Sequence, residues 1–429
     1  MVWRRLPGSP QNNDDIKGRM RNLITVAIAL CACFVTVSAQ DIDLLIRNGH
    51  VMDPRNRVDA TMDVALADGK ILEVAPRIDA SRAKKIVDAK GLYVSPGFID
   101  THTHVFVGSK SGFADGINSI SPDDFACRAG VTTVVDAGTS GWRNFPQFKE
   151  QVIDKSRTRI LAFISIAALG LSGKQAQENL EDMISDSAYT TLKKYPETIV
   201  GIKIGHYEGP DWTPFDRAVH AAEKAKAPLL VECHLPQLQL EEQLKRMRPG
   251  DIITHSFEKV SERMPVTDDN GKVRPFVSQA QKRGILFDVG HGGAGFWFSE
   301  AIPALKQGLA PNSFGTDLHR FSVNAGMKDM LNVMSKYMAM GMSLQDVILR
   351  ATWAPAQAIK RADLGHLSPG APADVAVWNV RKGKFGFVDA GGNRIEGDRK
   401  LETELTLREG KVVWDLNGLT AKEFHPPGK

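Results

Sequence analysis

The chain has 429 residues, of which 42% are hydrophobic and 24% are charged, and its mean hydropathy is −0.21. This composition is typical of a folded protein with a large core and excludes a largely disordered chain. The net charge is +4, and residues 1–39 carry most of it because five basic residues outnumber two acidic ones there. The rest of the chain is nearly neutral, which argues against nucleic acid or an anionic membrane surface as the main partner.

The first 39 residues have the layout of a secretory signal peptide. Lys17, Arg19 and Arg21 precede an apolar run over residues 23–37, and the small-residue sequence Val37-Ser38-Ala39 follows. This order of charged, apolar and small residues predicts a signal peptide over 1–39 that is cleaved after Ala39. We therefore expect an exported protein, periplasmic or secreted, with no membrane attachment once the signal is removed.

Three alternatives for this segment stay open. An apolar run of about 15 residues is shorter than the roughly 20 that span a bilayer, but an uncleaved anchor is the competing interpretation. Met20 could be the true start, which would explain the polar residues before it. The sequence Leu30-Cys31-Ala32-Cys33 loosely resembles a lipobox, so lipoprotein anchoring is a further alternative.

After cleavage only Cys127 and Cys233 remain, and we predict that both are buried free thiols.

Both ends of the remaining chain show the pattern of short strands and tight turns. Asp68-Gly69 and Glu409-Gly410 each lie between apolar, β-like runs, and the Asp-Gly pair is a strong hairpin signal. Neither end is long enough for a stable domain of its own. We predict that residues 41–94 and 366–429 together form one small β-sandwich domain.

The middle of the chain, residues 95–365, alternates short β-branched runs with helical stretches. Helix-then-strand alternation implies a parallel sheet with right-handed crossovers, and eight such units predict an α/β fold of the (β/α)₈ TIM-barrel type. The eight predicted strands are Val94–Thr101, Thr132–Asp136, Ile160–Ile166, Ile199–Ile204, Pro228–Cys233, Asp251–Thr254, Ile285–Val289 and Ser313–Gly315.

Polar residues follow the carboxyl ends of these predicted strands. Since strand ends of a barrel meet at one mouth, residues distant in sequence converge there. Because strand side chains repeat every two residues, His102 and His104 face the same way and can bind one metal ion. The residues at the strand ends are His102, His104, Lys203, His234, His255 and Asp317.

The sequence around the histidine pair resembles a known family. Pro96-Gly97-Phe98-Ile99-Asp100 leads into His102-Thr103-His104, which is similar to the strand 1 signature of the amidohydrolase superfamily of metal-dependent hydrolases. Less general segments at residues 134–138 with 144–145, 287–293 and 365–370 resemble its amidohydrolase/deacetylase branch, which is related to dihydroorotase-like enzymes. The resemblance runs from Asp41 to Trp414.

This resemblance implies a centre of two divalent metal ions, for which zinc suits the ligand types and manganese, cobalt or iron are alternatives. His102, His104 and Asp317 would hold the first ion, and His234 and His255, from strands 5 and 6, the second. The strand 4 residue Lys203 would bridge both ions as N6-carboxylysine, and Asp317 would also be the general base toward a metal-bridging hydroxide. Without the resemblance, a surface lysine, core histidines and a helix-capping aspartate would be the simpler interpretations.

Substrate contacts are predicted from loops at the same mouth. Gly292 and Gly293 give a loop whose backbone amides can approach a carboxylate or an oxyanion. Relatives commonly carry a basic residue two positions after the lysine, where this chain has Gly205, so a different pocket is expected. The candidate substrate-binding residues are His206, Tyr207, His291, Gly292, Gly293 and His319.

The predicted activity is that of a metal-dependent hydrolase of an amide or ester, which removes an acyl group from a small carboxylate-bearing molecule. The opening of a cyclic amide, as in dihydroorotase, is an alternative, and a secreted metal-binding barrel without activity is another. A nucleobase deaminase is disfavoured because those enzymes usually lack the strand 4 lysine. The sequence leaves open the substrate, its stereochemistry and whether the protein is a homo-oligomer.

Overall fold

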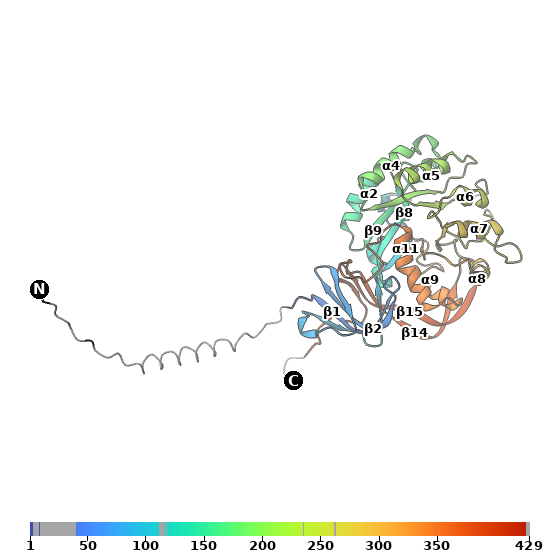
Figure 1. The fold of residues 1–429 in the computed structure, drawn as a ribbon. Coiled ribbons are helices and arrows are strands. Elements are labelled where there is room, and N and C mark those ends of the chain that lie inside the picture. Colours follow the sequence, from blue (N-terminus) through green and yellow to red (C-terminus); the bar gives the residue numbers. More distant parts are fainter. Residues whose placement is uncertain are drawn as a thin grey trace. The chain divides into compact units, whose positions relative to one another are not determined.

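The computed structural model describes residues 1–2, 8, 40–110, 116, 118–234, 236–260 and 263–425 (Figure 1). The predicted signal peptide therefore lies almost entirely outside the described residues, as do Cys31 and Cys33. Residues from Asp41 onward belong to one compact unit. No helix among the described residues is long and apolar enough to cross a membrane.

The middle of the chain forms a parallel sheet whose strands follow one another in chain order, as the sequence predicts. All the pairings in this sheet are parallel. Its strands are β6 (Phe98–Thr103), β8 (Val131–Gly141), β9 (Arg159–Ser165), β10 (Ile199–Gly205), β11 (Leu229–Glu232), β12 (Ile252–Ile253) and β13 (Leu286–Phe287), and the short β7 (Val107–Lys110) follows β6 outside the sheet.

An eighth segment closes this sheet into a barrel. Asp288, just after β13, forms a parallel bridge with Ser313, and Leu318 forms one with Thr103 at the end of β6. Residues 313–318 thus connect the last strand to the first, where the sequence predicts the eighth strand. The predicted barrel fold is confirmed.

Helices follow most of the barrel strands and lie on its outside (Figure 1). The sequence explains their ends: α7 begins at Pro275, whose fixed φ suits a first helical turn, and ends before Gly284 in a left-handed conformation. The helices are α2 (Phe145–Gln151), α3 (Lys174–Glu178), α4 (Ser185–Lys194), α5 (Thr213–Ala225), α6 (Leu240–Arg246), α7 (Pro275–Arg283), α8 (Phe298–Lys306), α9 (Met330–Ala339), α10 (Leu344–Ala351) and α11 (Trp353–Ala358).

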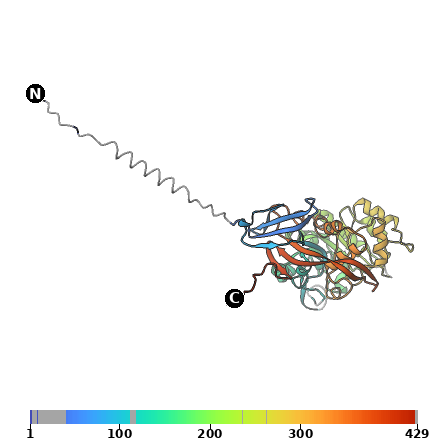
Figure 2. The same cartoon turned by 90° about the horizontal axis from the view of Figure 1, so that it is seen from below.

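The two chain ends contribute to a second sheet, in which the early and the late strands lie side by side (Figure 2). Its strand order is β16-β15-β14-β5-β1-β2-β3, and β4 also pairs with β1. The strands are β1 (Leu44–Asp53), β2 (Val58–Ala67), β3 (Lys70–Ala75), β4 (Ile86–Asp88), β5 (Tyr93–Pro96), β14 (Val375–Val388), β15 (Arg394–Arg408) and β16 (Lys411–Asp415).

Antiparallel pairing of β14 with β5 joins the two ends, since Val377 faces Val94 across the ladder. Both predicted hairpins are present, at Asp68-Gly69 between β2 and β3 and at Glu409-Gly410 between β15 and β16, with positive φ at all four turn residues. The β domain built from both chain ends is therefore confirmed, while its exact limits at residues 94 and 366 stay a prediction.

Candidate metal centre

The predicted strand-end residues gather at the mouth of the barrel. His102 lies in β6 with His104 just beyond it, Lys203 lies in β10, and His255 follows β12. Asp317 lies in the closing segment. His255 and Asp317 adopt φ values of 51° and 52°, a left-handed conformation that is uncommon for residues other than glycine. Such strain is typical of functional sites, where the surrounding structure holds a side chain in place.

One side of the mouth matches the predicted ligands of the first ion. Asp317 Oδ1 lies 3.1 Å from His104 Nε2 and 3.6 Å from His102 Nε2. All three residues are buried, and their ligand atoms lie within 4.8 Å of one another, close enough to coordinate one metal ion. The structure therefore brings these three predicted ligands together.

The other side is organised around a residue that the sequence analysis did not single out, Glu232. Its Oε1 lies 2.9 Å from His206 Nε2, 3.0 Å from His255 Nε2 and 3.2 Å from His234 Nε2. Its Oε2 forms an ion pair with Lys203 Nζ. Two further sets of ligand atoms within 4.8 Å both contain this carboxylate: His102, Glu232 and His255, and His206, Glu232 and His234.

One buried nitrogen at the centre, His102 Nε2, has no hydrogen-bond partner among the described residues, and Lys203 Nζ and Glu232 Oε2 have only their mutual ion pair. Buried polar atoms are normally satisfied, so their convergence on one point with so few partners needs an explanation. Imidazole nitrogens and carboxylate oxygens are the ligands that zinc and similar divalent ions prefer. The residues present therefore fit the divalent metals that amidohydrolases bind.

Hydrogen bonds behind the site orient two of the histidines for coordination. His255 Nδ1 lies 2.6 Å from the Gly290 carbonyl, which can only accept, so Nδ1 carries the hydrogen. Thr254 Oγ1 donates to Asp288, at 2.8 Å, and therefore accepts from His102 Nδ1, also at 2.8 Å. With Nδ1 engaged in this way, each ring directs Nε2 toward the site, which is the nitrogen that a metal would bind.

Burial and charge favour the protonation states that metal binding requires. Burial lowers the pKa of His102 well below its usual value and that of His104 to about 4. Burial alone would raise the pKa of Glu232 and Asp317, but neighbouring cationic groups, Lys203 and His319 first among them, hold both well below the usual range. Neutral imidazoles and charged carboxylates are therefore present together at neutral pH.

A cavity of about 400 Å³ opens above these residues. Three of the predicted substrate contacts line it: His206, Gly293 and His319. His234 also lies in its wall and is a quarter exposed, with Nδ1 3.1 Å from the Glu258 carboxylate. Glu258 in turn accepts a hydrogen bond of 2.7 Å from Arg263 Nη1.

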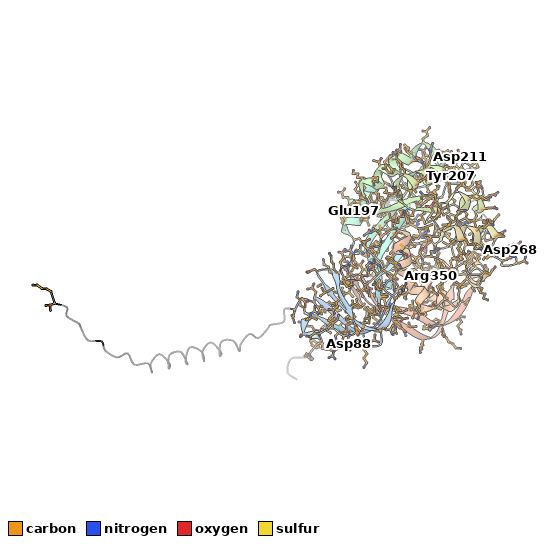
Figure 3. All side chains as sticks on the ribbon, in the orientation of Figure 1. Asp88, Glu197, Tyr207, Asp211, Asp268 and Arg350 are labelled. Carbon is orange, nitrogen blue, oxygen red and sulfur yellow. The ribbon has the colours of Figure 1, made fainter. Side chains whose placement is uncertain are left out.

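The other three predicted substrate contacts are not among the residues that line this cavity. His291 points away from it, with Nε2 2.6 Å from Lys336 Nζ and its ring stacked on Phe296. Tyr207 is buried in the loop between β10 and α5, near Asp211 (Figure 3). Both side chains pack within the protein and not against the cavity.

Gly292 has a role different from the predicted one. Its φ is +46°, and a Cβ atom placed on it would lie 2.1 Å from Asp317 Oδ2. Only a residue without a side chain allows the strand 7 loop to pass this close to the Asp317 carboxylate. Gly292 therefore leaves room for Asp317.

The sequence analysis missed Glu232, Glu258 and Lys336. Glu232 had a detectable signal, because an acidic residue at the end of a buried strand, Leu229-Leu230-Val231, is costly unless it has a partner. Glu258 lies in a loop and Lys336 in the middle of α9, and their partners are distant in sequence. No local pattern marks either of them.

Comparison with known proteins agrees with this geometry. The Amidohydrolase family profile matches residues 299–413. A deacetylase of Brucella anthropi is 33% identical over 337 residues, which cover 77% of this chain and 80% of the relative. Deacetylase Atu3266 of Agrobacterium fabrum is 33% identical over 324 residues, which cover 74% of this chain and 78% of the relative.

Solved structures show the same fold. A crystal structure of an adenine deaminase superposes with a TM-score of 0.80 at 27% identity, over 88% of this chain and all of the other. A dihydroorotase superposes with a TM-score of 0.77 at 28% identity, over 87% of this chain and 99% of the other. With its barrel, its buried histidines and carboxylates and these relatives, the chain belongs to the amidohydrolase superfamily and is a metal-dependent hydrolase of carbon–nitrogen bonds.

Proposed function

We propose that this protein is a deacylase that removes an acyl group, such as acetyl, from an amide or ester of a small carboxylate-bearing molecule. The observation that carries the proposal is the convergence of metal-ligand atoms of buried histidines and carboxylates, His102, His104 and Asp317 on one side and Glu232 and His255 on the other, below an open cavity. The deacetylase names of two relatives support acyl transfer to water as the reaction.

In this proposal, the mouth of the barrel would hold two divalent ions, and zinc is the metal that suits these ligand types best. His102, His104 and Asp317 would hold one, and His255 with a residue of strand 5 would hold the other. Lys203, fully buried, would bridge them as a carbamate formed with carbon dioxide. When bound, such ions supply a water molecule of lowered pKa and polarise a carbonyl oxygen.

Asp317 would accept the proton of the attacking water. Its carboxylate is held charged because the pKa lies well below the usual range, and His104 and His319 fix its orientation. His319 Nδ1 donates to the Asp317 carbonyl oxygen at 2.7 Å, and its ring lies at the cavity wall. A carboxylate fixed in this way can take the proton and later pass it to the leaving group.

The cavity supports a small, negatively charged substrate. Its volume of about 400 Å³ is within the range of small-molecule sites. Burial would lower the pKa of His234, but the Glu232 and Glu258 carboxylates raise it to about 9. A cationic imidazole in the wall, together with the ring nitrogens of His206 and His319, can bind a carboxylate.

Purified protein, loaded with zinc, should be assayed against N-acetyl amino acids of both hands and O-acetyl 2-hydroxy acids. Dihydroorotate, a hydantoin and adenine are the contrasting substrates, because the relatives include a dihydroorotase and an adenine deaminase. We expect acetate release that disappears in Asp317→Asn. Turnover of the ring substrates alone, or no turnover by metal-loaded protein, would contradict the proposal.

We also propose that the protein is exported. The support is the basic, apolar and small-residue order that ends at Ala39. N-terminal sequencing of the protein from its native host should find a start near Gln40. Soluble cytoplasmic protein that retains Met1 or Met20 would contradict export.

A further inference from the structure

Glu232 occupies the place at which β11 enters the barrel mouth. The strand ends at Glu232, which pairs in register with Gly205 of β10, whereas His234 lies two residues beyond the strand. Glu232 is 3% exposed and reaches Lys203, His255 and the vicinity of His102. The side chain at the end of the fifth barrel strand is therefore a carboxylate.

Gly205 provides the space for this carboxylate. A Cβ atom at Gly205 would lie 3.0 Å from Lys203 Cε and 3.2 Å from Glu232 Cβ, closer than most such contacts in proteins. A larger side chain there would push either Lys203 or Glu232 out of position. The absence of a side chain at Gly205, two residues after Lys203, therefore allows Glu232 to occupy this place.

Glu232 and His255 present two ligand atoms to the same point. His255 Nδ1 donates to the Gly290 carbonyl, so in a neutral ring Nε2 has only a lone pair to offer to Glu232 Oε1, at 3.0 Å. Two lone pairs at that distance repel each other. A divalent ion held by these two residues would satisfy both atoms, and His102, whose Nε2 has no hydrogen-bond partner, belongs to the same set of ligand atoms.

His234 has a different environment. Its two ring nitrogens lie between two carboxylates, with Nε2 3.2 Å from Glu232 and Nδ1 3.1 Å from Glu258. Both ring nitrogens of His234 therefore already face a carboxylate partner. His234 is also more exposed than the buried histidines and does not belong to the set formed by His102, Glu232 and His255.

We propose that Glu232, and not His234, is the strand 5 metal ligand of this protein, and that His234 instead forms the substrate-facing wall of the cavity. The inference rests on the proposed metal-dependent function. Because a carboxylate then replaces a neutral imidazole as the strand 5 ligand, the net charge of the metal site is lower by one. The second ion would be held by Glu232 and His255, next to Lys203.

The test is the metal content of three purified proteins, each reconstituted with zinc, dialysed and measured by elemental analysis. We expect about two zinc ions per chain in the wild type and in His234→Gln, and about one in Glu232→Gln. Loss of an orienting partner alone weakens metal binding by about 10–100-fold, so loss of a ligand should weaken the second site by more than about 100-fold. His234→Gln should raise KM for an active substrate and leave the zinc content unchanged.

The outcomes separate this inference from the proposed function. A wild type without stoichiometric metal would overturn both. If the wild type holds two ions and His234→Gln loses one of them, the assignment of His234 is overturned. If the wild type holds two ions and a folded Glu232→Gln variant keeps two with unchanged affinity, the assignment of Glu232 is overturned. The His234→Gln result decides the question even if Glu232→Gln does not fold, which circular dichroism would reveal.

Discussion

The two sides of the metal centre differ in how they are built. On the side of strands 1 and 8, His102, His104 and Asp317 lie where the sequence pattern places them, with ligand atoms 3.1 to 3.6 Å from Asp317 Oδ1. On the side of strands 4 to 6, the central group is Glu232, which no sequence motif predicted. On the first side the two histidines come from one local motif and Asp317 from the segment that closes the barrel, whereas the second side depends on where β11 ends.

The register of a strand, and not residue type alone, decides which residue at its end faces the barrel mouth. Glu232 and His234 are two positions apart, so period-two alternation allows either side chain to face the mouth. The end of β11 and the missing side chain at Gly205 decide in favour of Glu232. Four predictions follow from the contrast between the two sides.

The largest effect is expected from Lys203→Ala on the strand 4 side. The variant removes the ion-pair partner of Glu232 and, in the proposed mechanism, the bridge between two metals. Because metal chemistry contributes several kcal/mol to such reactions, we expect kcat to fall by about 10³–10⁵-fold, together with a lower zinc content. Added propionate should restore part of the activity by supplying a carboxylate. Full activity and full metal content in this variant would leave the bridging role without support.

Asp317→Asn probes the strand 8 side and should separate metal binding from proton transfer. The amide keeps one oxygen that can contact a metal but is a poor proton acceptor. We expect kcat to fall by about 10²–10⁴-fold while most of the zinc is retained. Steady-state kinetics and elemental analysis of the same preparation check this. If kcat changed less than tenfold, Asp317 would not be the general base.

Gly292→Ala tests how closely the strand 7 loop controls Asp317. The added Cβ would lie 2.1 Å from Asp317 Oδ2, so the carboxylate must move, and we expect kcat to fall by about 10–100-fold because small misplacements near the reacting atoms are costly. Gly308→Ala is the matched control, since its φ of +86° imposes similar backbone strain with nothing within 4 Å. Equal kcat values in the two variants would show that strain alone explains the effect.

The smallest effect concerns the support behind strand 7, where Lys336 contacts His291. Burial lowers the pKa of Lys336 from 10.5 to about 7. Between pH 10.5 and 7 the unfolded chain then binds more protons than the folded one, so this lysine increasingly destabilises the fold as pH falls through that range. Below about pH 7 the penalty is constant.

Lys336→Met removes this contribution. The difference in free energy of unfolding between variant and wild type, measured by urea denaturation from pH 10 to pH 6, should shift in favour of the variant down to about pH 7 and then level off. A difference that does not depend on pH would mean that Lys336 keeps an ordinary pKa in the folded protein.

Much of the fold follows from local sequence. Alternating strand and helix patterns identify the barrel, and Asp68-Gly69 and Glu409-Gly410 mark two hairpins because glycine, and to a lesser degree aspartate, adopts positive φ easily. The pairing of β5 with β14 joins segments about 280 positions apart in the chain. In the sequence, the only indication of this pairing is that neither end is long enough to form a stable domain alone.

The site was predicted where residues form a dense local motif and was missed where partners come from distant loops. His102 and His104 fall in one strand, so spacing alone brings them together. Glu258 reaches His234 from the next strand's loop, and Lys336 reaches His291 from α9. His291 and Tyr207 carry side chains suited to substrate binding, but packing turns them into the protein, which residue type does not reveal.

The most direct test of the account is anomalous X-ray diffraction at the zinc edge from crystals of the zinc-loaded protein. We predict two peaks at the barrel mouth, one within about 2.0–2.2 Å of ligand atoms from His102, His104 and Asp317, and one at the same range from His255 and Glu232. A second peak bound by His234 without Glu232, or no peak at the mouth, would contradict the account.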